Sequence, residues 1–224
     1  MTSPVNLHPQ NIKAMPSGVK PQVHPSVVSR SKRILDIFGA IIGLAITGII
    51  TIPVAIAMMF DDPGSIFYSQ VRCGFNGKPF KIWKFRSMIA NAHRQQHLVE
   101  NQATGYIFKN EDDPRITRVG RFLRRTSLDE FPQFWNVLKG EMSLVGTRPP
   151  TVEEVAMYED HHFQRLKVKP GITGEWQVKG RSMVLDFEDI VRMDLNYQKK
   201  WSFFYDLNLI VLTIVVVIAR KGAC

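Results

Sequence analysis

The feature that most constrains the fold is a run of 24 residues without a charged side chain, from Ile37 to Phe60. As an α-helix this run would be about 36 Å long, and the hydrocarbon core of a bilayer is about 30 Å thick. Charged residues bound the run at both ends, among them Asp36 and Asp61. The run therefore predicts a membrane segment.

Pro53 bears on the path of this segment, with 16 uncharged residues before it and 7 after it. Proline removes a helical hydrogen bond and clashes with the preceding turn, so the sequence predicts a kink there. Basic residues flank both ends, Arg30, Lys32 and Arg33 before the run and Arg72, Lys78 and Lys81 after it. This distribution favours both ends on the cytoplasmic face and hence a re-entrant hairpin. A kinked single span remains an equal alternative on these residues alone.

Residues 1–30 differ sharply from the membrane segment. They contain five prolines, no acidic residue and no Phe, Trp or Tyr. Such a stretch buries too little apolar surface to offset the entropy of ordering. We expect a disordered N-terminal tail over 1–30, a membrane helix over 31–62 and one domain over 63–224, without a cleaved signal peptide.

A β-hairpin is predicted after the membrane segment. Ser65–Arg72 and Lys78–Met88 have strand character, and Asn76-Gly77 between them is a strong turn signal. Side chains alternate along a strand, so Lys84 and Arg86 should share a face. The plain alternative for two such residues is a solvated strand edge.

The remainder is predicted to be mostly helical, which gives an α+β fold. Apolar and basic residues alternate at helical spacing over Ile116–Arg125, as in a helix that lies on an anionic membrane surface. Trp201–Ala219 is apolar and aromatic-led, and is expected either to be buried or to lie in the interface. Further helices are expected over Phe131–Lys139, Glu153–Lys167 and Asp186–Gln198.

Most of the net charge of +9 comes from the centre of the chain, because residues 72–148 contain 14 Lys or Arg against 7 Asp or Glu. Such a block predicts an anionic partner, either lipid head groups or nucleotides. No recognisable nucleic-acid module accompanies it, so we expect no nucleic-acid partner. The adjacent His161 and His162 do not have chelating spacing on a helix, so no metal site is expected there.

Two adjacent carboxylates, Asp129 and Glu130, lie within this basic block. The plain interpretation is a capping box that begins at Ser127. Pro132 favours a helix start nearer Phe131, which would leave both carboxylates on the lead-in turn and free to face a ligand. The neighbouring arginines, Arg121, Arg124, Arg125 and Arg148, suit phosphate binding.

Several stretches of the chain, in order, resemble the bacterial sugar transferases, the monotopic phosphoglycosyl transferases. They are SKRILDIFGA, DDPGSIFYSQVRCGFNGKPFKIWKFRSM, LRRTSLDEFPQFWNVLKGEMSLVGTRP, KPGITGEWQVKGR and the final KGAC. The resemblance implies a membrane-associated catalytic domain on the cytoplasmic face of the bacterial inner membrane, with a re-entrant helix broken at Pro53. Two positions depart from the family pattern. Ile52 stands where the family has serine before the proline, and Thr147 replaces a proline before Arg148.

The resemblance also implies an activity. A sugar 1-phosphate passes from a UDP-sugar to polyprenyl (undecaprenyl) phosphate through a covalent intermediate on Asp129, with UMP released, which initiates exopolysaccharide or other glycan assembly. Mg²⁺ would be bound by Asp129 and Glu130, and glucose or galactose is the sugar expected. The predicted substrate ligands are Arg124, Arg148, Lys84, Arg86 and Arg181.

A different class of function is a non-catalytic membrane adaptor that binds anionic lipids through its basic block. Substitution of Asp129 or Glu130 would then be silent, whereas charge reversal in the basic run would release the protein from vesicles. Carboxylates inside a basic surface weaken its attraction to anionic lipids, which favours the enzyme. Assembly into a homo-oligomer stays open.

Overall fold

The computed structural model describes residues 23–180 and 184–219. Its α-helices are α1 Pro25–Val28, α2 Arg30–Asp61, α3 Arg118–Arg125, α4 Phe134–Lys139, α5 Val152–Ala156, α6 Glu175–Lys179, α7 Phe187–Lys200 and α8 Phe203–Ile218. The strands are β1 Phe67–Cys73, β2 Pro79–Phe85, β3 Ser143–Val145 and β4 Gly171–Thr173. The 3₁₀ turns are η2 Phe75–Gly77, η3 Ala92–Leu98, η4 Leu128–Gln133 and η5 His162–Lys167.

These elements confirm the predicted α+β class with a small hairpin. Strands β1 and β2 pair antiparallel, with Phe67 opposite Phe85. Asn76 and Gly77 have positive φ angles of 54° and 74° in the connection, as an Asn-Gly hairpin turn requires. A second pair, β3 with β4, is parallel and was not predicted.

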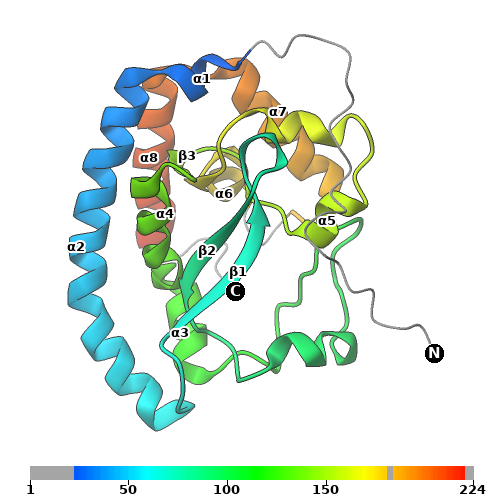
Figure 1. The fold of residues 1–224 in the computed structure, drawn as a ribbon. Helices are drawn as coiled ribbons and strands as arrows, with labels where there is room; N and C mark the ends of the chain where they lie inside the picture. The colour runs from blue at the N-terminus through cyan, green and yellow to red at the C-terminus, as the bar shows by residue number, and fades with distance from the viewer. Residues whose placement is uncertain (1–22, 181–183, 220–224) are drawn as a thin grey trace.

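Helix α2 lies along one side of the molecule and packs against α4 (Figure 1). Its 32 residues include Pro53, and the helix continues past that residue to Asp61. Its last turns bend toward β1 in Figure 1. Among the described residues α2 is the helix long and apolar enough to cross a bilayer. Its path relative to a membrane stays a prediction.

Both ends of α2 are attached to the same body of the protein. Near the N-terminal end, the Lys32 ammonium lies 2.6 Å from the Asp206 carboxylate of α8, and both side chains are buried. Arg33 donates to the carbonyl oxygens of Val137 and Leu138 at the end of α4, at 2.8 and 2.7 Å. At the other end, the Asp61 carboxylate accepts from the Val119 amide of α3 at 2.8 Å.

The middle of α2 approaches α4 closely because it carries glycine. A Cβ atom added at Gly43 would lie 2.3 to 2.5 Å from ring atoms of Phe134, whereas one at Gly48 would meet nothing within 4 Å. Next to this contact, buried Ala40, Met142 and Leu144 form part of a core that also includes residues of β2. Helix α2 is thus packed directly on η4, the turn that contains Asp129, and on α4.

The structure corrects two predicted segments. Residues 1–22 of the expected tail lie outside the described residues, but Pro25–Val28 forms helix α1, and the His24 side chain caps it while its Nε2 lies 3.0 Å from the Gln198 carbonyl. The helix expected over Glu153–Lys167 is divided into α5 and η5. The His162 ring accepts the Glu159 amide at 2.9 Å, and this side-chain bond replaces continuation of the helix.

Candidate active site

The paired carboxylates lie on a 3₁₀ turn and not in a capping box. Ser127 has a φ angle of 57° and its side chain makes no capping bond. Asp129 and Glu130 occupy η4, and the regular helix α4 starts only at Phe134. The lead-in turn predicted from Pro132 is therefore formed, somewhat longer than expected.

Lys84 of β2 meets both carboxylates. Its Nζ atom lies 2.8 Å from Glu130 Oε1 and 3.9 Å from Asp129 Oδ2. Asp129 is only 8% exposed, whereas the side chains of Lys84 and Glu130 are partly accessible. The hairpin thus brings a cation predicted as a phosphate ligand to the predicted nucleophile.

The surroundings of Asp129 oppose its ionisation. Burial raises the pKa of Asp129 to about 6, Lys84 and Arg124 act in the opposite direction, and the Glu130 charge adds to the increase. Arg124 of α3 donates through Nε to the Ser87 hydroxyl at 3.0 Å, which fixes its guanidinium on this side of the site. A buried carboxylate with a raised pKa beside cations is typical of a functional site.

Arg86 has other partners than Lys84. Its guanidinium pairs with the Asp62 carboxylate and donates to the Ser65 carbonyl at 2.7 Å. Strand β2 ends at Phe85, but the Arg86 amide still donates to the Ile66 carbonyl at 2.8 Å, in register with the hairpin. Arg86 therefore joins the end of α2 to the hairpin in this structure.

Arg148 has a carboxylate partner that the sequence did not indicate. Its Nη1 lies 2.9 Å from Glu154 Oε2, and Glu154 also accepts the Thr151 amide within the capping box of α5. Glu154 is buried and Arg148 holds its pKa below the usual value despite desolvation. The Arg148 guanidinium is thus fixed by an ion pair as well as by its backbone. Arg181 lies outside the described residues.

Sequence reasoning missed Arg72 of β1. Its guanidinium donates to the Pro149 carbonyl at 3.0 Å, next to Arg148, and to Gln70 Oε1 at 2.9 and 3.1 Å. Tyr68, Gln70 and Arg72 alternate with the residues that face the other way, so they share one side of β1. Tyr68 is opposite Lys84 in the register, which is a signal that the predicted hairpin already contained.

A second cluster, distant in sequence, gathers His161, His162 and Glu188, whose nearest ligating atoms lie within 4.8 Å of one another. His162 Nδ1 accepts the Glu159 amide, and its Nε2 is 2.7 Å from Glu188 Oε1. Both ring nitrogens of His162 are thus engaged in hydrogen bonds that leave no lone pair for a metal. The predicted regular helix is replaced here by η5, and the two histidines lie together beside Glu188.

The donors at Asp129 and Glu130 fit the Mg²⁺ predicted from the resemblance. Carboxylate oxygens are the ligands that this ion prefers. Burial and the adjacent Glu130 charge both raise the pKa of Asp129, and a bound cation would counter both effects.

Comparison with known proteins identifies the family of the chain. The sequence model described as "Bacterial sugar transferase" matches residues 27–220. The chain belongs to this family. Among bacterial sugar transferases it is 52% identical to the galactosyl transferase CpsE of Streptococcus agalactiae over 195 residues, which are 86% of this chain and 43% of that protein.

Two further relatives differ in the share of their length that the chain matches. The UDP-glucose:undecaprenyl-phosphate glucose-1-phosphate transferase of Escherichia coli is 41% identical over 199 residues, 86% of this chain and 41% of the relative. The exopolysaccharide production protein ExoY of Sinorhizobium fredii is 39% identical over 199 residues, 86% of this chain and 88% of the relative. The chain thus spans less than half the length of CpsE and of the E. coli enzyme.

Proposed function

We propose that this protein transfers a sugar 1-phosphate from a UDP-sugar to undecaprenyl phosphate through a covalent intermediate on Asp129, in the initiating step of a polysaccharide. The observation that carries the proposal is the buried Asp129 carboxylate, adjacent to Glu130 and 3.9 Å from the Lys84 ammonium. The printed name of the E. coli relative describes the same donor and acceptor classes.

In the first step an Asp129 oxygen attacks the phosphorus that carries the sugar. The bond from this phosphorus to the oxygen shared with the nucleotide breaks, and UMP leaves with that oxygen. Lys84 contributes positive charge where the attacking carboxylate and the phosphate would otherwise repel each other. Arg124 adds charge from α3.

In the second step a phosphate oxygen of the lipid attacks the same phosphorus. The bond to Asp129 breaks, the carboxylate is regenerated, and the lipid leaves as a diphosphosugar. Glu130 is more exposed than Asp129 and can accept a proton from the incoming phosphate. Two steps allow the lipid phosphate to enter after the nucleotide has left.

Mg²⁺ held by Asp129 and Glu130 would supply charge neutralisation at the transferred phosphoryl group. Lys84 then keeps its contact with Glu130, at 2.8 Å in this structure, and orients that carboxylate. Burial of Asp129 limits competition by water for the phosphorus.

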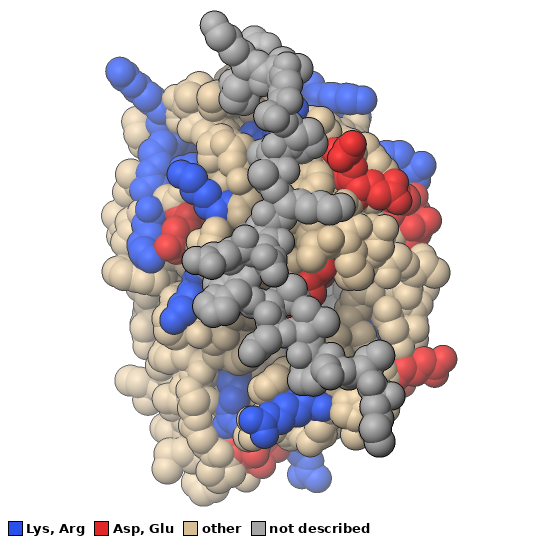
Figure 2. Space-filling view, turned by 45° about the vertical axis from the view of Figure 1, so that its right-hand side comes forward, with Lys and Arg blue, Asp and Glu red and all other residues tan. Residues whose placement is uncertain are grey.

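The bilayer contact is proposed to lie on α2 and α8. Exposed apolar residues on α2 include Phe38, Ile49 and Phe60, and those on α8 include Phe204 and Ile218. Since both ends of α2 bond to one body, we propose that α2 dips into the inner membrane from its cytoplasmic face and that this body stays on that face. Figure 2 shows basic side chains along the left edge, near the bottom and toward the upper right of the view, and such side chains can meet anionic head groups.

The test is the intact mass of the detergent-solubilised protein after incubation with Mg²⁺ and a panel of UDP-sugars, without lipid. We expect a mass gain of one phosphosugar with release of UMP, both absent in Asp129→Asn. The sugar that reacts identifies the donor.

UMP release that requires polyprenyl phosphate and leaves no adduct would indicate direct transfer in a ternary complex, and would contradict the covalent step. No turnover with any sugar and lipid, together with vesicle binding that depends on Arg121 and Arg125, would instead indicate the adaptor.

A further inference from the structure

Arg72 is a partly buried cation whose charge no carboxylate pairs directly. Within residues 23–180 and 184–219, the acceptors of its guanidinium are the neutral oxygens of Gln70 and Pro149. Its pKa is lowered to about 10, first by burial and next by the Arg148 charge. Two arginines thus lie close together where Glu154 pairs directly with only one of them. Such an excess of positive charge is stabilised by an anionic ligand.

The geometry of Arg72 leaves donors for that ligand. Gln70 accepts from Nε and Nη2, and Pro149 accepts from Nη1, so three N–H groups are used. A guanidinium has five, which leaves one N–H on each terminal nitrogen without an acceptor among the described residues. A pair of terminal N–H groups matches two oxygens of a phosphate.

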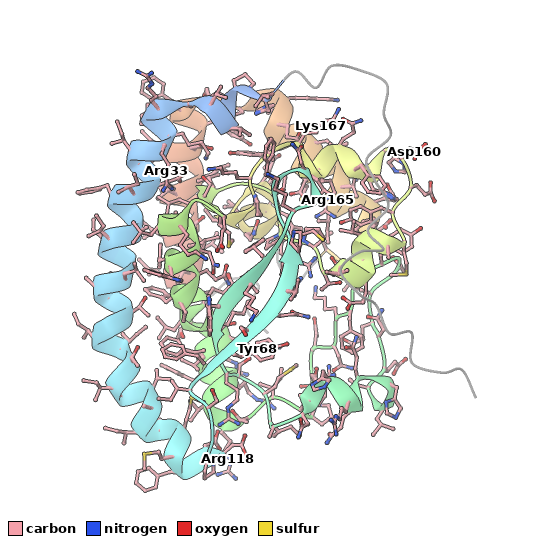
Figure 3. The ribbon with its side chains drawn as sticks, in the orientation of Figure 1. Arg33, Tyr68, Arg118, Asp160, Arg165 and Lys167 are labelled. Carbon is pink, nitrogen blue, oxygen red and sulfur yellow. The ribbon has the colours of Figure 1, made fainter. Side chains whose placement is uncertain are left out.

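The position of Arg72 on β1 relates its two remaining N–H groups to the proposed reaction. Tyr68 and Arg72 share one side of β1, and Tyr68 is opposite Lys84. This side of β1 therefore extends from the carboxylates beside Lys84 to the loop that carries Arg148. The Glu130 charge is near enough to raise the pKa of Arg72, against the larger effect of burial. Figure 3 labels Tyr68 on the lower part of the hairpin. Arg72 is opposite Phe80 in the register, so it is displaced along the strand from Lys84, on which the sugar phosphate is proposed to bind.

Supporting contacts hold the second arginine in place. The Arg148 guanidinium carbon lies 5.9 Å from the centre of the Trp176 ring, on the side of α6. The indole Nε1 of Trp176 is buried without a hydrogen-bond partner among the described residues. A buried donor of this kind is normally satisfied, so it indicates a ligand or water at this place.

We propose that Arg72, together with Arg148, binds the nucleotide phosphate of the donor, the group that leaves as UMP. The proposal rests on the proposed function, since it divides one nucleotide sugar between two ends of the site. Lys84 and the carboxylates act on the phosphorus that carries the sugar. Arg72 contacts the phosphate that departs, so its role is substrate binding with charge stabilisation of the leaving group.

The experiment measures UMP binding directly, by calorimetry on the full chain in detergent with Mg²⁺, so that turnover is not needed. The variants are Arg72→Gln, which removes the charge, and Arg72→Lys, which keeps the charge without the fork. Arg192→Gln on α7 is the matched control, because its exposed side chain pairs with Asp189 on the surface and its loss changes the net charge equally. Uridine, which has no phosphate, is titrated in parallel.

Arg72→Gln should raise the Kd for UMP about 10- to 100-fold, as expected for hydrogen bonds to a charged group, and leave the Kd for uridine within about twofold. The Kd of Arg72→Lys for UMP should lie between those of the unsubstituted protein and Arg72→Gln. The Kd of Arg192→Gln should match that of the unsubstituted protein. In steady-state assays, Arg72→Gln should raise the KM for the UDP-sugar without raising that for the lipid.

Three results would overturn the inference. They are no measurable UMP binding by the unsubstituted protein, an unchanged UMP affinity in Arg72→Gln, and equal losses of UMP and uridine affinity. The last would mean that Arg72 only attaches the Pro149 loop to the hairpin. If any of these results is found together with an adduct on Asp129, the proposed function is supported and the phosphate site at Arg72 is rejected. Arg72-dependent UMP binding without an adduct supports the phosphate site and contradicts the covalent transfer.

Discussion

At the scale of residues, Asp129 combines two opposing requirements. Its low exposure excludes water, yet the same burial raises its pKa to about 6. A nucleophile must be ionised, so the site needs nearby positive charge, which Lys84 and Arg124 provide. The two requirements together produce a carboxylate whose charge changes close to physiological pH.

The raised pKa of Asp129 predicts the pH dependence of the first step. Below pH 6 the rate of adduct formation should fall about tenfold per pH unit, because only the ionised fraction of Asp129 reacts. Above pH 7 the rate should level off. Single-turnover mass spectrometry between pH 5 and 8 checks this, and a rate that is constant over this range would contradict it. Increasing Mg²⁺ should move the midpoint to lower pH.

A second prediction concerns stability. The folded pKa of Asp129 is about 6 and its ordinary value is 3.8, so its contribution to folding is full below about pH 4 and is lost as the pH rises through 6. Asp129→Asn should therefore gain stability over the unsubstituted protein between pH 5 and 8, by at most about 3 kcal/mol. Thermal unfolding of both proteins at pH 5 and at pH 8 measures the gain in stability.

Asp189→Asn is the control for that measurement, because it removes a partly exposed carboxylate on the surface of α7. It should change the free energy of unfolding by at most about 1 kcal/mol, as is usual for a surface ion pair. A gain for Asp129→Asn that is equal at both pH values would mean that the charge of Asp129 is not responsible.

At the scale of elements, the close approach of α2 to α4 predicts a contrast between two glycines in one helix. Gly43→Ala places a methyl group against the Phe134 ring and should cost about 1 to 3 kcal/mol. Gly48→Ala meets nothing within 4 Å and should be neutral or slightly stabilising. Thermal unfolding in detergent compares them, and equal effects would contradict the packing described.

Local signals explain which elements could be predicted. The hairpin depends on Asn76-Gly77, the end of α4 on Gly140 and the start of α7 on Asp186, and all three act over a few residues. The parallel pair of β3 with β4 could not be found this way. Each strand has three residues, and 25 positions separate Val145 from Gly171. Only long-range packing places them together.

The candidate site likewise combines contacts that the sequence motifs predicted with contacts that depend on long-range packing. Asp129, Glu130 and Lys84 are brought together as the motifs suggested, and their chemical roles stay predictions. The ion pair of Arg148 with Glu154 and the contact of Arg72 with Pro149 depend on how separate segments fold against each other. The ion pair of Arg86 with Asp62 likewise depends on how the end of α2 meets the hairpin.

At the scale of the whole molecule, the exposed apolar side of α8 predicts how the protein binds lipid. Val211 and Val215 are 58% and 56% exposed. Replacement of both by Asp should weaken flotation with liposomes, since a charged residue within a bilayer costs about 2.5 to 3.5 kcal/mol and less near the interface. Asn208→Asp adds charge at an exposed polar position of the same helix and should float normally. Equal flotation of the double variant would remove α8 from the bilayer contact.

The attachment of α2 at both ends has a mechanical consequence. A helix fastened by Lys32 at one end and Asp61 at the other cannot change its depth or angle in the lipid independently of the body to which it is attached. A change in the packing of the lipid around α2 must therefore deform the lipid or strain the packing of Gly43 on Phe134, the residue at which α4 begins just beyond η4. We therefore expect turnover to vary with the acyl-chain length of the surrounding phospholipid, so that the catalytic centre responds to the physical state of the membrane.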